Sequence, residues 1–143
     1  MNPLVVDASV AAKWLLPPGG EPFADKAKSL LARYVNREIQ IVVPDIFWAE
    51  LANLLWKAAR TARCTSAEAL ASLEAIRAQQ FSTVASIHLA ESALRIACQS
   101  DRTAYGALYV ALAEELNGSF ITADEKLANA LAARYPVKWL GAQ

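Results

Sequence analysis

The sequence predicts a single α/β domain over residues 1–143, in which helices cover both faces of a central sheet. Short apolar runs alternate with longer segments of helical periodicity, which is typical of a mostly parallel sheet. The length of 143 residues suits one domain, and 55% hydrophobic against 20% charged residues indicates a compact core. We therefore expect a three-layer α/β/α fold with four or five strands.

The predicted elements follow one another with short connections and no long linker. The strands are expected at Leu4–Val6, Ile39–Val43, Thr83–Ser86, Phe120–Thr122 and Val137–Leu140, because these runs are short and apolar. The helices are expected at Ala8–Leu16, Pro22–Asn36, Asp45–Ala62, Ala67–Gln79, His88–Gln99, Thr103–Leu116 and Asp124–Arg134. Either Thr65 or Ser66 can cap the fourth helix, and Asp101 is expected to cap the sixth.

Composition excludes several classes of protein. Fourteen basic residues balance fourteen acidic ones, so any nucleic-acid partner has to be held by a local patch. His88 is the only histidine, which rules out a His-rich zinc site. Cys64 and Cys98 lack metal spacing, and we interpret them as buried or half-buried thiols in a reducing compartment. No apolar run approaches the ~20 residues that span a bilayer. We expect a cytoplasmic protein without membrane association.

Acidic residues follow three of the predicted strands. Asp7 comes directly after the first strand, Asp45 lies two residues after Val43, and Asp124 lies two after Thr122. The carboxyl ends of parallel strands meet at one edge of a sheet, where α/β proteins place their sites. Carboxylates gathered there repel one another unless protons or a cation relieve them, and Mg²⁺ prefers such oxygen ligands.

Helix capping is the alternative explanation for each of these aspartates. An Asp between a strand and a helix is often an N-cap that stabilises by about 1 kcal/mol. Asp45 fits capping best, whereas Ser9 can cap in place of Asp7 and leave Asp7 free. Glu50 is harder to explain this way, because it lies inside a helix among apolar neighbours with no basic residue at helical spacing. We expect Glu50 to meet a cation, a proton or a polar partner.

Four segments together resemble the PIN-domain family, most closely the VapC-type toxins of bacterial toxin–antitoxin pairs. They are LVVDASV at 4–10, PDIFWAEL at 44–51, TAYGALYVALA at 103–113 and ITADEKL at 121–127. The resemblance implies a metal-dependent endoribonuclease that hydrolyses RNA phosphodiester bonds with Mg²⁺ or Mn²⁺ held by Asp7, Glu50 and Asp124. Ser9 and Thr122 can hydrogen-bond these ligands or their waters. The resemblance also implies a cognate antitoxin protein as partner, and a homodimer.

One position departs from the family pattern. The family usually places an Asp where this chain has Gly106. Glycine inside a helix costs about 1 kcal/mol relative to alanine, and no local feature of the sequence requires it. Either a neighbouring helix approaches too closely for a side chain, or an acid has been lost, by natural decay or by deliberate inactivation of a toxic protein. We favour a lost acid, which weakens metal binding and reduces activity.

Three function hypotheses follow. The first is an active toxin ribonuclease, the second a catalytically inactive PIN domain that binds RNA or an antitoxin, and the third a metal-independent interaction module. Candidate RNA contacts are Lys13, Arg102 and Lys126, each of which is otherwise an ordinary solvated charge. The aromatic residues Trp14, Phe47, Trp48 and Trp56 are expected mostly in the core, with some available to a partner groove.

Overall fold

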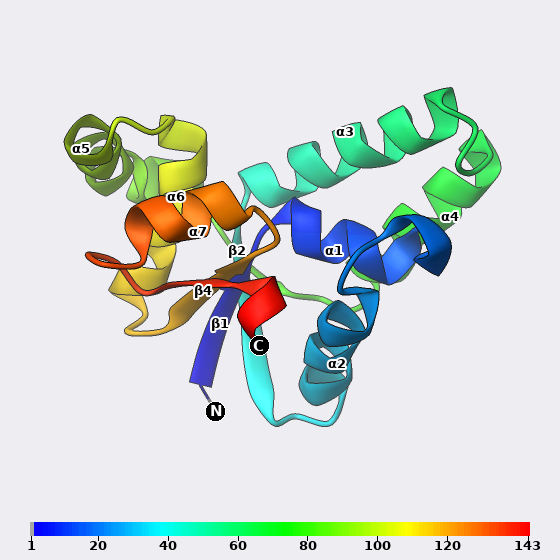
Figure 1. Cartoon of the computed structure of the whole chain (residues 1–143), viewed down its shortest axis with the longest axis horizontal. Helices are drawn as coiled ribbons and strands as arrows, with labels where there is room; N and C mark the ends of the chain where they lie inside the picture. The colour runs from blue at the N-terminus through cyan, green and yellow to red at the C-terminus, as the bar shows by residue number, and fades with distance from the viewer. Residues whose placement is uncertain (1) are drawn as a thin grey trace.

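The computed structural model describes residues 2–143 and has a five-stranded sheet at its centre (Figure 1). The strands are β1 Asn2–Val6, β2 Ile39–Pro44, β3 Ser82–Val84, β4 Ser119–Thr122 and β5 Val137–Trp139, in the order β3-β2-β1-β4-β5. Each neighbouring pair is parallel. The predicted α/β class and parallel sheet are confirmed, and each expected strand is present with ends shifted by a few residues.

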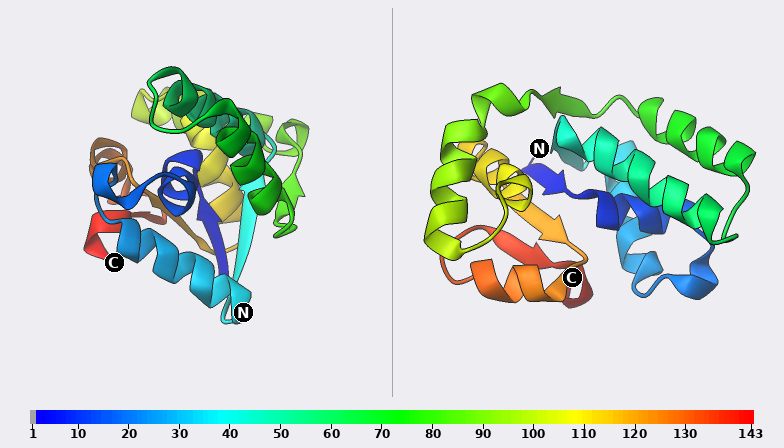
Figure 2. Two further views of the ribbon diagram at one scale, coloured as in Figure 1. Left: turned by 90° about the vertical axis from the view of Figure 1, so that its right-hand side faces the viewer. Right: turned by 90° about the horizontal axis from the view of Figure 1, so that it is seen from above.

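Within residues 2–143, seven α-helices surround the sheet. They are α1 Ala8–Leu15, α2 Ala24–Val35, α3 Ile46–Arg60, α4 Ser66–Arg77, α5 Ala90–Ser100, α6 Ala104–Glu115 and α7 Glu125–Leu131, with 3₁₀ turns at Pro18–Gly20, Ser86–His88 and Leu140–Ala142. α6 packs on β1, β2 and β4, and α5 lies outside it. α1 and α2 pack together and contact β4 and β2, while α7 packs on β4 and β5. α3 and α4 form a hairpin that projects from the body of the molecule (Figure 2).

The core is built from the central strands and α6. Val5 and Val6 of β1 and Phe120 of β4 are fully buried, and Val5 pairs with Val42 on one side and Phe120 on the other. α6 is buried from Ala107 to Ala113, which explains why its sequence is apolar around the whole helix. From β1 the chain adds β2 and then β3 on one side of the sheet, and it then crosses to the other side to add β4 and β5. The strand order therefore reverses at β1. A crevice forms at the carboxyl ends of strands where such a reversal occurs.

Some local predictions are confirmed and others are wrong. Thr65 is the N-cap of α4 and forms a full capping box with Glu68, so the helix begins at Ser66. Asp101 ends α5 in the left-handed conformation, and the N-cap of α6 is Thr103, whose hydroxyl accepts from the Gly106 N–H at 3.3 Å. Cys98 is exposed, whereas Cys64 is partly buried as expected.

No helix within residues 2–143 has both the length and the apolar character that crossing a membrane requires.

Candidate functional site

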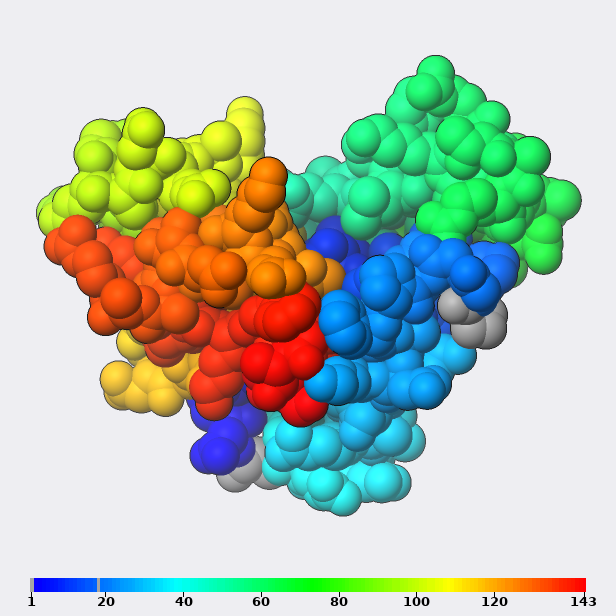
Figure 3. All heavy atoms as spheres, in the orientation of Figure 1, coloured from blue at the N-terminus to red at the C-terminus, as the bar shows by residue number. Residues whose placement is uncertain are grey.

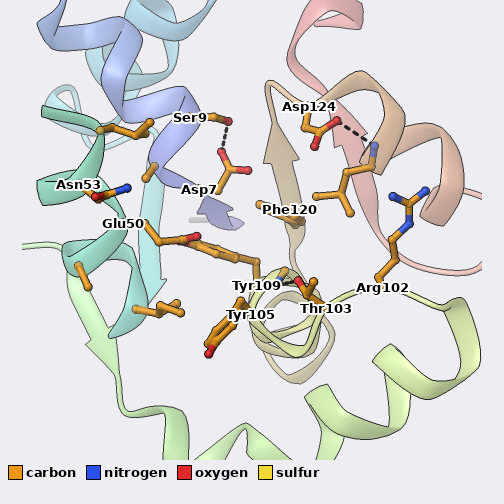
Figure 4. Close-up of a pocket in the computed structure, with 16 residues that line it drawn as sticks. Asp7, Ser9, Glu50, Asn53, Arg102, Thr103, Tyr105, Tyr109, Phe120 and Asp124 are labelled. Carbon is orange, nitrogen blue, oxygen red and sulfur yellow. Dashed lines mark hydrogen bonds between the residues drawn. The ribbon is translucent and has the colours of Figure 1, made fainter. Parts of the chain in front are cut away.

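A pocket of about 720 Å³ lies at the carboxyl ends of the central strands. Its lining includes the three predicted site acids, Asp7 after β1, Glu50 from α3 and Asp124 before α7. In Figure 4, Asp7 lies near the middle of the pocket, with Glu50 approaching from one side and Asp124 from the other. The parallel sheet therefore brings together acids that are far apart in the sequence, at the edge where sequence reasoning expects them.

Asp7 is held by hydrogen bonds from both of the hydroxyls predicted to support the site. Its Oδ1 accepts from Ser9 Oγ at 2.5 Å, and its Oδ2 accepts from Thr122 Oγ1 at 2.6 Å. Oδ1 also accepts from the Val10 N–H at 3.3 Å. Asp7 is thus the N-cap of α1, and the prediction that Ser9 caps in its place is wrong. Capping and the site position are compatible, because the carboxylate faces the pocket from the helix start.

The charge on Asp7 is unfavourable where it lies. Burial raises the pKa of Asp7 above its ordinary value, because desolvation penalises the carboxylate form. The hydrogen bonds from Ser9, Thr122 and Val10 act in the opposite direction, and the negative charge of Glu50 raises the pKa further. The charges of Asp7 and Glu50 therefore oppose each other inside the pocket, and a cation near both would relieve that repulsion.

Glu50 has the polar partner that its apolar surroundings predict. The hydroxyl of Tyr109, on α6, donates a hydrogen bond to Glu50 Oε1. Tyr109 is 2% exposed and its ring stacks on Phe120, with centroids 5.2 Å apart. Burial, the hydrogen bond to Glu50 and the nearby carboxylates all raise the pKa of Tyr109, so its phenol stays protonated and remains a donor. Sequence reasoning missed Tyr109, although it lies three residues after Gly106 and hence on the same helix face.

Asp124 lies on the opposite side of the pocket and is exposed. Its Oδ1 accepts from the Leu127 N–H at 3.1 Å, which makes it the N-cap of α7. Its own N–H donates to Thr122 Oγ1 at 3.1 Å. The Thr122 hydroxyl therefore bridges the backbone of Asp124 and the carboxylate of Asp7, and fixes the two segments relative to each other.

The three acids share a pocket without forming a compact cluster. Within residues 2–143, no group of three or more His, Cys, Asp or Glu side chains is arranged to hold a metal ion. The donor chemistry nevertheless suits a hard divalent cation, because the lining supplies carboxylate oxygens and neither histidine nor thiol. Asp7 and Glu50 lie close enough to repel each other. The donor chemistry thus fits Mg²⁺ or Mn²⁺ at Asp7 and Glu50, with Asp124 on the opposite side of the same pocket.

Gly106 lines the same pocket, within the first turn of α6. A Cβ built at this position would meet Thr103 Oγ1 at 3.7 Å, which is ordinary contact, and no other neighbouring side chain or helix among the described residues comes within 4 Å. The explanation by close helix–helix approach is therefore wrong. A Cβ can be accommodated at this position, so the glycine leaves open space at the wall of the pocket.

The remaining predicted residues have mixed outcomes. Asp45 does not cap α3 with its side chain; its carboxylate instead accepts from the Ser86 N–H at 3.0 Å and ties α3 to the end of β3. Arg102 is exposed and lines the pocket that contains Asp7, Glu50 and Asp124, which we call the acidic pocket. Lys126 is exposed but does not line it. Lys13 is buried and paired with Glu21, in an adjoining pocket.

The aromatic residues divide between core and surface. Phe47 is fully buried, and Trp14 and Trp48 pack partly buried against the core, which confirms most of the expectation. Trp56, on the projecting α3, is 54% exposed, and Arg60 lies over its ring. Trp56 is therefore available for contact with another molecule.

The sequence is similar to a known protein family and to several of its members. The PIN domain family model matches residues 4–131 of the chain. Ribonuclease VapC3 of Pyrobaculum aerophilum is 32% identical over 134 residues, which cover 91% of this chain and 95% of that protein. Ribonuclease VapC9 of Mycobacterium tuberculosis is 31% identical over 134 residues, covering 94% of this chain and 95% of its own.

Solved structures share the fold. The crystal structure of PAE2754 from Pyrobaculum aerophilum has a TM-score of 0.69 at 24% identity and covers 99% of this chain and 91% of that chain. VapBC2 from Rickettsia felis, bound to a DNA fragment from its promoter, has a TM-score of 0.65 at 11% identity, with 96% and 98% covered. These likenesses show the fold alone. Because the family model spans most of the sequence and relatives above 30% identity match nearly its full length, the chain belongs to the PIN domain family.

Proposed function

We propose that this protein is a ribonuclease toxin of a VapBC-type toxin–antitoxin pair, which hydrolyses RNA phosphodiester bonds with Mg²⁺ or Mn²⁺. The observation that carries the proposal is the pocket itself, into which separate segments bring Asp7, Glu50 and Asp124. Relatives called VapC ribonucleases, similar over almost the whole chain, support the reaction class. This activity requires no structural element beyond the fold described above.

The residues have distinct roles in this proposal. Asp7 and Glu50 hold the ion, and Asp124 completes the site. A bound divalent ion polarises a phosphoryl oxygen and makes water a stronger nucleophile. Ser9 and Thr122 orient the Asp7 carboxylate through the hydrogen bonds described above.

We assign roles to three further residues from their charge and their position relative to the pocket. Tyr109 fixes the Glu50 carboxylate by donating to it. Arg102, at the pocket rim, neutralises a phosphate of the substrate. Because Lys126 is exposed outside the pocket, it contacts RNA only beyond the reacting phosphate.

Gly106 lowers the activity in this proposal. A family acid at this position would add a negative charge to the pocket, and the open space at Gly106 supports its loss over a packing requirement. Fewer carboxylates leave more ligand positions to water and hold the ion with lower affinity. The alternative function is a catalytically inactive PIN domain that binds RNA or an antitoxin without cutting.

We also propose an antitoxin partner and a homodimer. The solved VapBC2 complex of Rickettsia felis has this fold. Exposed apolar side chains on the outer helices, Trp56, Leu70 and Leu94, provide surface for protein contact. Light scattering on the isolated chain tests the dimer, and co-purification with the product of an adjacent small reading frame tests the antitoxin.

The deciding experiment is RNA cleavage with Mg²⁺ or Mn²⁺ by the chain as it stands, by Gly106→Asp and by Asp7→Asn. The proposed function predicts weak cleavage by the first, stronger cleavage by Gly106→Asp, and none by Asp7→Asn. Cleavage by Gly106→Asp alone would establish the inactive alternative for this chain. If Mn²⁺ leaves the melting temperature unchanged and Asp7→Asn binds partners normally, the protein is a metal-independent interaction module.

A further inference from the structure

A second pocket, of about 310 Å³, adjoins the acidic one and shares Ser9 and Leu54 with it. Its charged lining residues are Lys13, Lys57, Arg63 and Glu21, so we call it the basic pocket. It lies where α1, α3 and the turn after α3 meet. Figure 3 shows the molecule hollowed between the α3–α4 hairpin and α7, and residues of α3 line both pockets.

The charge of the basic pocket is positive even though it contains a carboxylate. Lys13 Nζ lies 3.2 Å from Glu21 Oε2, and Arg63 Nη2 lies 2.8 Å from Glu21 Oε1. Both oxygens of Glu21 are thus engaged by cations. Lys57 also lines the pocket, and it has no ion pair among the residues that the structure describes. Three positive groups therefore face one negative group.

Two of the three basic groups, Lys13 and Arg63, are held in place before any ligand arrives, whereas Lys57 is exposed. Lys13 is 6% exposed, so its charge is poorly screened by solvent. The guanidinium of Arg63 lies so close to the Gly20 backbone that a Cβ there would come within 2.9 Å of Nη2. Glu21 joins both cations and holds them at one position. A ligand with an anionic group meets a positive site with little ordering cost.

We propose that the basic pocket binds a backbone phosphate of the RNA strand, next to the phosphate that occupies the acidic pocket. This subsite rests on the proposed ribonuclease function. The acidic pocket repels phosphate in the absence of a cation, whereas the basic pocket attracts it with or without metal. A strand that crosses Ser9 passes from one pocket to the other, because Ser9 lines both. The subsite therefore supplies metal-independent affinity and sets the path of the strand across Ser9.

The test compares Lys57→Ala with Lys28→Ala. Both lysines are exposed, and Lys28 on α2 lies outside both pockets, so the two variants remove the same charge. Binding of a short labelled single-stranded RNA of mixed sequence is measured by fluorescence anisotropy in EDTA over a range of salt concentrations. Gel analysis afterwards verifies that the RNA is intact, and thermal unfolding verifies that both variants are folded.

We expect Lys57→Ala to bind RNA about fivefold more weakly at low salt, with the slope of log K against log salt reduced by about 0.7, while Lys28→Ala matches the parent. Equal binding by the two variants, with the parent still binding RNA, overturns the subsite and leaves the ribonuclease proposal standing. A parent that binds no RNA in EDTA also overturns the subsite, and the cleavage assay with Mg²⁺ or Mn²⁺ decides the ribonuclease proposal separately. If Lys57→Ala loses affinity for a polyglutamate peptide and not for RNA, the pocket accommodates an acidic polypeptide and the RNA subsite is wrong.

Discussion

The hydroxyl of Tyr109 donates a hydrogen bond to the carboxylate of Glu50, and this contact joins α6 to α3 across the candidate site. Neither residue could reach solvent easily for a substitute partner, because Tyr109 is buried and Glu50 is half-buried. The phenol also has the Ala8 backbone beside it, at the start of α1. One hydroxyl on α6 therefore contacts two other segments that surround the acidic pocket, α3 and the start of α1.

Replacing Tyr109 with Phe is expected to weaken metal binding more than it weakens the fold. The ring keeps its stacking on Phe120, and the loss of one hydrogen bond costs about 1 kcal/mol of unfolding free energy. Glu50 becomes free to turn away from Asp7, so more Mn²⁺ is needed to raise the melting temperature. The measurement is thermal unfolding across a Mn²⁺ titration.

Tyr135→Phe is the matched control for this change. Its hydroxyl donates to Gln99 at 3.0 Å on the exposed surface, away from the pocket. It is expected to leave the Mn²⁺ midpoint unchanged. An identical Mn²⁺ midpoint in Tyr109→Phe and the parent would show that Tyr109 does not position Glu50 for the ion.

The fold and the location of the site were predictable because both depend on simple sequence patterns. Short β-branched runs predict β1, β2 and β4, and parallel strands place Asp7 and Asp124 at one edge. Glu50 was identifiable because an acid on an apolar helix face requires a partner. The partner itself was not identifiable, because the contact with Tyr109 joins residues 59 positions apart and a buried tyrosine in an apolar helix is ordinary core.

Asp7→Asn is expected to stabilise the metal-free protein. Burial raises the pKa of Asp7, so its ionisation in the folded state costs free energy that the unfolded state does not pay. Removing the charge should therefore raise the free energy of unfolding near neutral pH, since the Asn side-chain oxygen still accepts the capping hydrogen bond. The gain should shrink as pH falls through the folded-state pKa, because Asp7 is then protonated in the parent as well.

Asp101→Asn provides the comparison for Asp7→Asn. Asp101 is exposed and left-handed, a conformation that Asn tolerates, so its unfolding free energy should change little. Adding Mn²⁺ should reverse the order, stabilising the parent and Asp101→Asn while leaving Asp7→Asn unchanged. Chemical denaturation with and without Mn²⁺ measures both effects. A metal-free Asp7→Asn that is less stable than the parent would show that the carboxylate contributes more by capping than it costs by burial.

Comparing Gly106→Asn with Gly106→Asp separates the effect of a side chain at this position on fold stability from the effect of its charge on metal binding. A Cβ at position 106, in the first turn of α6, meets no clash, so helix propensity should stabilise the metal-free Asn variant by a few tenths of a kcal/mol. The Asp variant adds a charge near Asp7 and should be less stable than Asn without metal and more stable with Mn²⁺. Thermal unfolding of both variants across a Mn²⁺ titration measures this reversal in the order of their melting temperatures. If Mn²⁺ raises the two melting temperatures equally, the side chain at position 106 does not reach the ion.

Helix ends illustrate what sequence alone left undecided. Asp7, Asp45 and Asp124 each sit between a strand and a helix, yet Asp7 and Asp124 cap their helices while Asp45 binds the backbone of Ser86. The difference arises because β3 ends beside Asp45, which is a long-range contact that no local pattern contains. Lys13 shows the same limit, because its burial depends on Glu21 and Arg63 from other segments.

Glu21 should matter more to stability than its buried cationic partner Lys13. The Lys13 and Glu21 side chains are 7% and 12% exposed, and Arg63 is 38% exposed. Glu21→Ala leaves Lys13 buried without a counter-charge, and it should lower the free energy of unfolding by about 2 kcal/mol after allowance for the exposure of Arg63. Lys13→Met keeps the apolar packing and leaves Glu21 paired with Arg63, so its cost should stay below about 1 kcal/mol. Urea unfolding at neutral pH measures the two changes, and a larger loss in Lys13→Met than in Glu21→Ala would show that the Lys13 charge, rather than its packing, holds this corner of the fold together.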